Sequence, residues 1–166
     1  MNGTSVIGGG SPGSVSDEWA IVGVGDFNGD GKADVLWRDT SSQVHIWLMN
    51  GTSISRAGSV AMASSDWTVV GVGDFDQDRK ADILWRHTSG AVSLWLMDGT
   101  TVVKSGSLRA MGTDWSVVGV ADYAGFGAAN VLWRDASGSV YMWYVHRDFS
   151  VGSGRMGSIT TDWHAQ

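Results

Sequence analysis

Two short loops in this sequence carry oxygen-bearing side chains at a spacing that can surround a hard cation. The first reads Asp26-Phe-Asn28-Gly-Asp30-Gly-Lys32-Ala-Asp34, and the second reads Asp74-Phe-Asp76-Gln-Asp78-Arg-Lys80-Ala-Asp82. Positions 1, 3, 5 and 9 supply carboxylate or amide oxygens, and the main-chain carbonyl at position 7 adds another ligand. Calcium accepts such flexible oxygen coordination more readily than magnesium does. The spacing predicts two calcium sites per chain, with metal-free Asx turns as the alternative.

A third loop at the equivalent place departs from this pattern. It reads Asp122-Tyr-Ala124-Gly-Phe126-Gly-Ala128-Ala-Asn130, so positions 3 and 5 have lost their oxygens. Asp122 and Asn130 alone are not expected to hold calcium. The second loop is expected to be weaker than the first, because Arg79 replaces a glycine at a sharp turn.

An exact 48-residue repeat positions these loops. All ten tryptophans follow it, as Trp19, Trp67, Trp115 and Trp163, as Trp37, Trp85 and Trp133, and as Trp47, Trp95 and Trp143. Each unit holds four short segments that are apolar on both faces and separated by turns, such as Asp98-Gly99. Such units are typical of β-propeller blades, which are four-stranded antiparallel sheets packed between similar sheets. The sequence therefore predicts an all-β fold, with an irregular β-sandwich as the alternative.

The repeat also predicts how the chain is divided. We expect one repeat domain over 1–166, with blades at 19–66, 67–114 and 115–162. Residues 1–18 are expected to hold the outer strand of a preceding blade, and 163–166 the start of a next inner strand. Because propellers have about four to eight blades, three units are too few for a ring. We therefore expect a homo-oligomer that closes the ring, or a segment of a longer propeller.

The segment Val-Gly-Asp-Phe-Asn-Gly-Asp-Gly-Lys-Ala-Asp-Val-Leu-Trp at 24–37, which recurs at 72–85, resembles the FG-GAP or VCBS repeat family. These are calcium-loop propellers typified by the integrin α-subunit head, and the repeat covers essentially the whole chain. The resemblance implies a structural calcium ion in each intact loop. The ligands it implies are Asp26, Asn28, Asp30, the Lys32 carbonyl and Asp34, then Asp74, Asp76, Asp78, the Lys80 carbonyl and Asp82.

A Leu-Trp-Arg element recurs in every unit and has two interpretations. Its members are Trp37 and Arg38, Trp85 and Arg86, and Trp133 and Arg134. An aromatic face beside a guanidinium can form a carbohydrate-binding pocket. The alternative is that the indoles form the core between blades while the arginines pair or extend to solvent.

Several functional classes receive no support from the sequence. A net charge of −6 disfavours nucleic acid, and no apolar stretch is long enough to insert into a bilayer. The chain has no cysteine, and its four histidines occupy non-equivalent positions with no motif for a nucleophile or phosphate loop. We therefore expect no catalytic site, and a role in a polysaccharide-active enzyme would rest on analogy alone.

These observations favour a calcium-stabilised, lectin-like binding module that recognises a carbohydrate or protein ligand. The alternative is a structural unit that supplies blades to an oligomeric ring or a larger adhesin. No signal peptide is visible at the N-terminus. An extracellular or cell-surface location is inferred instead, because weak calcium loops fill best at the calcium concentration outside cells.

Overall fold

The computed structural model describes residue 11 and residues 14–158. Antiparallel sheets make up this part of the chain. In chain order the strands are β1 (Trp19–Gly25), β2 (Asp34–Asp39), β3 (Gln43–Asn50), β4 (Ser53–Met62), β5 (Trp67–Gly73), β6 (Asp82–His87), β7 (Val92–Asp98), β8 (Thr101–Leu108), β9 (Trp115–Ala121), β10 (Asn130–Asp135), β11 (Ser139–Val145) and β12 (Val151–Ser158). Consecutive strands pair into three four-stranded sheets, β1 to β4, β5 to β8 and β9 to β12. The predicted all-β architecture is confirmed for these residues.

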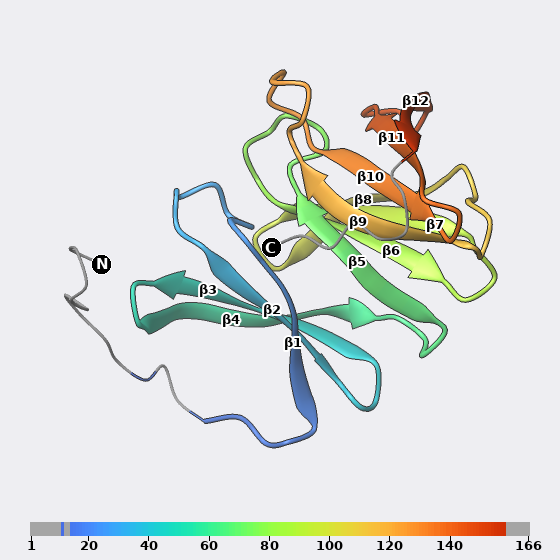
Figure 1. The fold of residues 1–166 in the computed structure, drawn as a ribbon. Coiled ribbons are helices and arrows are strands. Elements are labelled where there is room, and N and C mark those ends of the chain that lie inside the picture. The colour runs from blue at the N-terminus through green and yellow to red at the C-terminus, as the bar shows by residue number, and fades with distance from the viewer. Residues whose placement is uncertain (1–10, 12–13, 159–166) are drawn as a thin grey trace, which may run out of the picture.

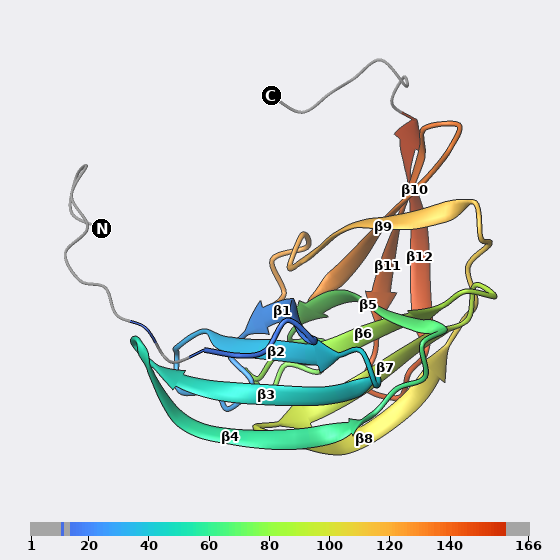
Figure 2. The ribbon, with the colours of Figure 1, turned by 90° about the horizontal axis from the view of Figure 1, so that it is seen from below.

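The three sheets follow one another as successive blades, which we number 1 to 3 (Figures 1 and 2). β1 packs beside β5, and β5 packs beside β9, so the first strand of each blade lies on the inner side. The strands of one blade fall within 19–66, those of the next within 67–114, and those of the last within 115–162. The strands expected near Met1–Thr4 and at 163–166 lie outside the described residues. Within the described part, no helix is long and apolar enough to cross a bilayer.

The core lies between the blades. One cluster joins Phe27, Leu36 and Ile46 of blade 1 to Ile83 and Trp85 of blade 2, all of them buried. A second cluster joins blades 2 and 3 in the same way. Each such side chain contributes about 1.5–3 kcal/mol when fully buried. Burial on both faces explains why the two middle strands of a blade, such as β6 and β7, are mostly apolar, whereas the outer strand β8 is more polar and mostly exposed.

Glycines on the inner strands allow the blades to approach closely. A Cβ atom added at Gly23 would lie 2.6 Å from Cγ2 of Val72 on the next blade, and Gly71 faces Val120 in the same way. The register of each inner strand shifts just before this glycine, as between Val69 and Gly71. At Gly23 and Gly71 the close approach therefore comes from a valine of the following blade.

Candidate metal centre

Three equivalent loops, numbered 1 to 3 in chain order, connect the first and second strands of their blades and share one backbone conformation. Positive φ angles recur at positions 4 and 6, which are Gly29 (76°) and Gly31 (82°), Gln77 (65°) and Arg79 (69°), and Gly125 (72°) and Gly127 (82°). This left-handed region costs a non-glycine residue about 1–2 kcal/mol. Loop 2 therefore keeps the same shape as the others at a greater conformational cost.

The first aspartate of each loop organises the turn. The Asp26 carboxylate accepts hydrogen bonds from the main-chain nitrogens of Gly29 at 2.7 Å, Asp30 at 3.1 Å and Gly31 at 2.7 Å. Asp74 accepts the three equivalent bonds in loop 2. Asp122 accepts two of them in loop 3. Because loop 3 lacks the side-chain oxygens at positions 3 and 5 and still keeps two of these bonds, the turn itself does not depend on the full ligand set.

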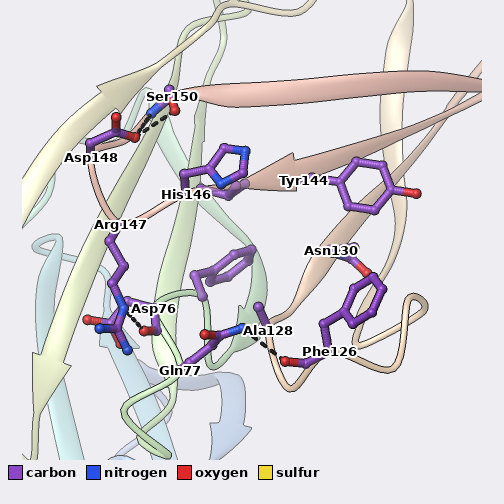
Figure 3. Close-up of a pocket in the computed structure, with 12 residues that line it drawn as sticks. Asp76, Gln77, Phe126, Ala128, Asn130, Tyr144, His146, Arg147, Asp148 and Ser150 are labelled. Atoms are coloured by element: carbon purple, nitrogen blue, oxygen red, sulfur yellow. Dashed lines mark hydrogen bonds between the residues drawn. The ribbon is translucent and has the colours of Figure 1, made fainter.

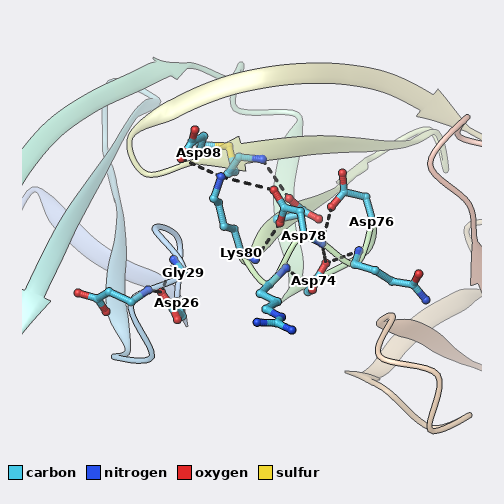
Figure 4. Close-up of polar contacts among 12 residues, drawn as sticks. Asp26, Gly29, Asp74, Asp76, Asp78, Lys80 and Asp98 are labelled. Carbon is cyan, nitrogen blue, oxygen red and sulfur yellow. Dashed lines mark hydrogen bonds and ion pairs between the residues drawn. The ribbon is translucent and has the colours of Figure 1, made fainter.

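Three carboxylates converge in loop 2 (Figure 4). Asp74, Asp76 and Asp78 each offer an oxygen atom, and these three atoms lie within 4.8 Å of one another. Burial, followed by the charge of Asp78, raises the pKa of Asp76. Lys80 Nζ lies 3.6 Å from Asp78 Oδ2 and 3.1 Å from Asp98 Oδ1, so its single positive charge is shared. Like charges at this separation repel one another, and a divalent cation would relieve that repulsion.

Loop 1 places its predicted ligands in an equivalent arrangement. Asn28 Oδ1 accepts from the main-chain nitrogen of Asp30 at 3.0 Å, and Asp30 Oδ1 accepts from that of Lys32 at 2.9 Å. Lys32 Nζ also contacts Asp30 Oδ2 at 2.9 Å. This exposed contact lowers the pKa of Asp30. Asp76 and Asp78 make the corresponding main-chain bonds in loop 2.

The aspartate at position 9 ties loops 1 and 2 to the third strand of their blades. Asp34 is fully buried, and it accepts hydrogen bonds from the main-chain nitrogens of Phe27 at 2.9 Å and Met49 at 2.8 Å. Asp82 accepts the two equivalent bonds, but it is not one of the three carboxylates that converge in loop 2. Each of its oxygens keeps a lone pair for a metal ion.

Charge at position 9 is not balanced by any nearby cation in the described structure. Burial raises the pKa of Asp34, and burial with the charges of Asp76 and Asp78 raises the pKa of Asp82 to about 7. A hard divalent cation is the partner that such an all-oxygen, anionic set suits best. The residues of loops 1 and 2 therefore fit calcium, whereas Ala124 and Phe126 leave loop 3 without side-chain oxygens at positions 3 and 5.

The loops also join neighbouring blades. Asp26 O accepts a hydrogen bond from Ala81 N of blade 2 at 2.7 Å, and Asp74 O accepts one from Ala129 N of blade 3 at 2.6 Å. Phe27 O accepts another from Gly99 N at 2.7 Å. An ion that rigidified a loop would therefore also hold the interface with the next blade.

The Leu-Trp-Arg elements lie at the blade interfaces. Trp37, Trp85 and Trp133 are buried, and each packs against the second tryptophan of its own blade with ring centroids 4.8 Å apart. Arg86 Nη2 donates to Gly112 O at 2.6 Å, and its guanidinium lies 4.9 Å from the Trp133 ring centroid.

Arg38 makes the corresponding contacts one blade earlier, donating to Trp67 O and Ala63 O and lying 5.7 Å from the Trp85 ring. Arg134 is half-buried on β10. The tryptophan rings, Arg38 and Arg86 are therefore packed at the blade interfaces. This packing is the arrangement that the sequence analysis gave as the alternative to a carbohydrate pocket.

The structure also shows a cleft that the sequence analysis did not identify. It lies between blades 2 and 3, beside loop 2, and is lined in part by Phe126, Asn130, Tyr144 and Arg147 (Figure 3). The available signal was the departure of the third repeat from the first two at these positions. In the sequence, that departure by itself indicates only the loss of a metal site.

Comparison with known families is consistent with this geometry. Residues 26–85, from the first aspartate of loop 1 to Trp85, match the FG-GAP-like repeat family. No curated protein matches the chain. The resemblance read from the sequence is thereby confirmed, and this segment of the propeller-like chain is an FG-GAP-like repeat.

Proposed function

We propose that the chain is a calcium-stabilised propeller module that acts outside the cell in recognition of glycans. The observation that carries the calcium assignment is the convergence of Asp74, Asp76 and Asp78 within 4.8 Å. Loop 1 repeats the same side-chain pattern, and FG-GAP repeats are generally calcium-associated. Calcium would complete the ligand set and fix each loop to the following blade. Weak sites of this class fill at the millimolar calcium found outside cells.

Thermal unfolding with calcium or with a chelator tests this proposal. An ion that binds only the folded state stabilises it by about 1.4 kcal/mol per site at tenfold excess over Kd. Two sites would add about 3 kcal/mol, or about 6–12 °C in Tm for a chain of this size. Magnesium should give a much smaller shift, because it demands a stricter octahedral geometry.

The matched variants separate metal binding from loop folding. Asp30→Ala with Asp78→Ala removes position 5 from both intact loops and should abolish most of the calcium-dependent shift. Asp122→Ala removes main-chain hydrogen bonds from loop 3, so it should lower Tm and leave the calcium shift unchanged. The difference between calcium and chelator is the readout, since Asp30 also caps its own turn. Equal Tm in calcium and in chelator for the wild-type protein would refute the assignment.

Assembly into a larger ring is a second candidate function, and the outer face of blade 1 favours it. Ile21 and Val24 on β1 are 57% and 56% exposed. The equivalent of Val24 in blade 2, Val72, packs against Gly23 of blade 1. A second copy of this chain could cover Val24 with the equivalent glycine of its own blade 3, Gly119. The Tyr123 hydroxyl now lies over Gly119, so this contact requires the tyrosine ring to swing aside.

The mass in solution, from light scattering after size exclusion, tests assembly. We expect two or more chains per particle, and Val24→Arg should reduce the particle to one chain. A 17.6 kDa particle for the wild-type chain would refute assembly through this face. That outcome would leave the calcium proposal unaffected.

A further inference from the structure

The cleft between blades 2 and 3 is built from three segments that are far apart in the chain. Loop 2 supplies one side, loop 3 supplies another, and the connection between β11 and β12 closes the third. Its volume is ≈ 650 Å³, within the range of small-molecule sites in proteins. We call this space the blade 2/3 cleft.

Three substitutions in the third repeat open the cleft. At the junction of blades 1 and 2, the stem of Lys80 lies against Gly29, and its Nζ pairs with Asp98 at 3.1 Å. The third repeat has Ala128 in place of Lys80 and His146 in place of Asp98. Arg147 replaces Gly99, whose main-chain nitrogen bonds to blade 1. The space that a paired lysine fills at one junction is therefore empty of side chain at the next.

The same repeat places two exposed aromatic rings in the cleft. Phe126 is 78% exposed and stands where loops 1 and 2 have aspartate. Tyr144 is 38% exposed and stands where blade 2 has Leu96, which is only 5% exposed. Large aromatic side chains exposed beside a concave surface are characteristic of ligand sites. A sugar ring can stack its C–H face on such rings while its hydroxyls reach polar groups.

Polar groups with unused hydrogen-bonding capacity face the same space. Asn130 is 97% buried (3% exposed), and its Oδ1 accepts from Ala124 N at 3.1 Å. Its amide nitrogen makes no hydrogen bond within the described residues. Figure 3 shows this side chain between Tyr144 and Phe126. The Asn130 amide nitrogen is not a buried atom without a partner but reaches the solvent of the cleft, where a ligand oxygen can accept a hydrogen bond from it.

A cation and an anion complete the lining. Arg147 Nε donates to the main-chain oxygen of Asp76, while its two terminal nitrogens have no partner among the described residues. Asp148 Oδ1 accepts from Ser150 N at 3.0 Å and from its hydroxyl at 2.6 Å, which fixes the turn and leaves Oδ2 available. Because acidic groups offset the Arg147 charge, the cleft suits an uncharged polyol better than an anion.

We propose that the blade 2/3 cleft binds a short neutral saccharide, with Phe126 and Tyr144 stacking on it and Asn130 and Arg147 donating hydrogen bonds. The inference deepens the proposed role in glycan recognition and assigns that role to the third repeat. Asp76 belongs both to the cleft and to the converging carboxylates of loop 2. Calcium in loop 2 would therefore order one wall of the binding site.

A glycan array probed with the labelled full chain, in calcium, tests the proposal. We expect binding to neutral oligosaccharides, followed by titration of the best one by calorimetry. Ala128→Lys and Tyr144→Leu each introduce the residue that blade 2 carries at the equivalent position. Each should weaken binding at least about fivefold, because Tyr144→Leu removes an aromatic contact and Ala128→Lys fills part of the cleft with a side chain. Asn130→Ala should weaken it similarly.

Tyr123→Leu is the control, because Tyr123 is 47% exposed and does not line the cleft. It should bind as the wild type does. A folded wild-type protein that binds no neutral saccharide, or unchanged affinity in both Ala128→Lys and Tyr144→Leu, would overturn the inference. The calcium shift in Tm is measured on the same variants and should persist in all of them. Failure of the cleft is therefore distinguishable from failure of the metal assignment.

Discussion

The left-handed backbone at Arg79, one of two such non-glycine residues in loop 2, predicts that a glycine at this position stabilises the protein. Arg79 has a φ of 69°, whereas the equivalent residues Gly31 and Gly127 are both glycines at 82°. Its guanidinium makes no hydrogen bond or ion pair among the described residues. Arg79→Gly removes about 1–2 kcal/mol of backbone strain. It also adds about 0.4–1 kcal/mol of unfolded-state entropy, which opposes the gain. We expect a net increase of about 0.5–1 kcal/mol in the free energy of unfolding.

Two matched variants fix the interpretation. Gly31→Ala should lower the free energy of unfolding by a similar amount, and since nothing lies within 4 Å of the added Cβ, the whole effect is conformational. Arg109 is exposed and its φ is not positive, so Arg109→Gly makes the same chemical change and should destabilise. Urea unfolding in chelator measures all three, with the m value as a check on two-state behaviour. A loss of stability in Arg79→Gly, or no change in Gly31→Ala, would refute the reasoning.

Two further predictions concern the blade interfaces. Gly23→Ala places a Cβ 2.6 Å from Val72 Cγ2, so it should lower the free energy of unfolding by about 1–3 kcal/mol. Gly154→Ala has nothing within 4 Å of the new atom and serves as its control; equal effects of the two in urea would contradict the close approach. Arg86→Met keeps an apolar stem, loses the charged bond to the Gly112 carbonyl and the stacking on the next blade, and should lower Tm at a cost of about 2–3 kcal/mol. Arg109→Met, at an exposed position, should change Tm by less than 1 °C. If Arg109→Met lowered Tm as much as Arg86→Met does, the interface role of Arg86 would be contradicted.

Much of this protein could be predicted from local sequence. The exact period of the tryptophans and the turn residues defined four strands per unit, because strand and turn preferences act over a few residues. Spacing within one loop likewise brought Asp74, Asp76 and Asp78 together, since residues two apart in a tight turn must lie close. The loss of oxygens at Ala124 and Phe126 was equally visible.

Contacts between blades were decided only by the tertiary structure. A repeat specifies where a residue sits in its own blade, and a core tryptophan and a pocket tryptophan share that position. Packing of Arg86 on Trp133 depends on how one sheet stacks on the next. The blade 2/3 cleft likewise needs Asp76 and Tyr144 to meet across an interface that no local pattern encodes. The periodic sequence thus determined the unit and its loops, whereas the stacking of the sheets determined which surfaces are buried and where a ligand can enter.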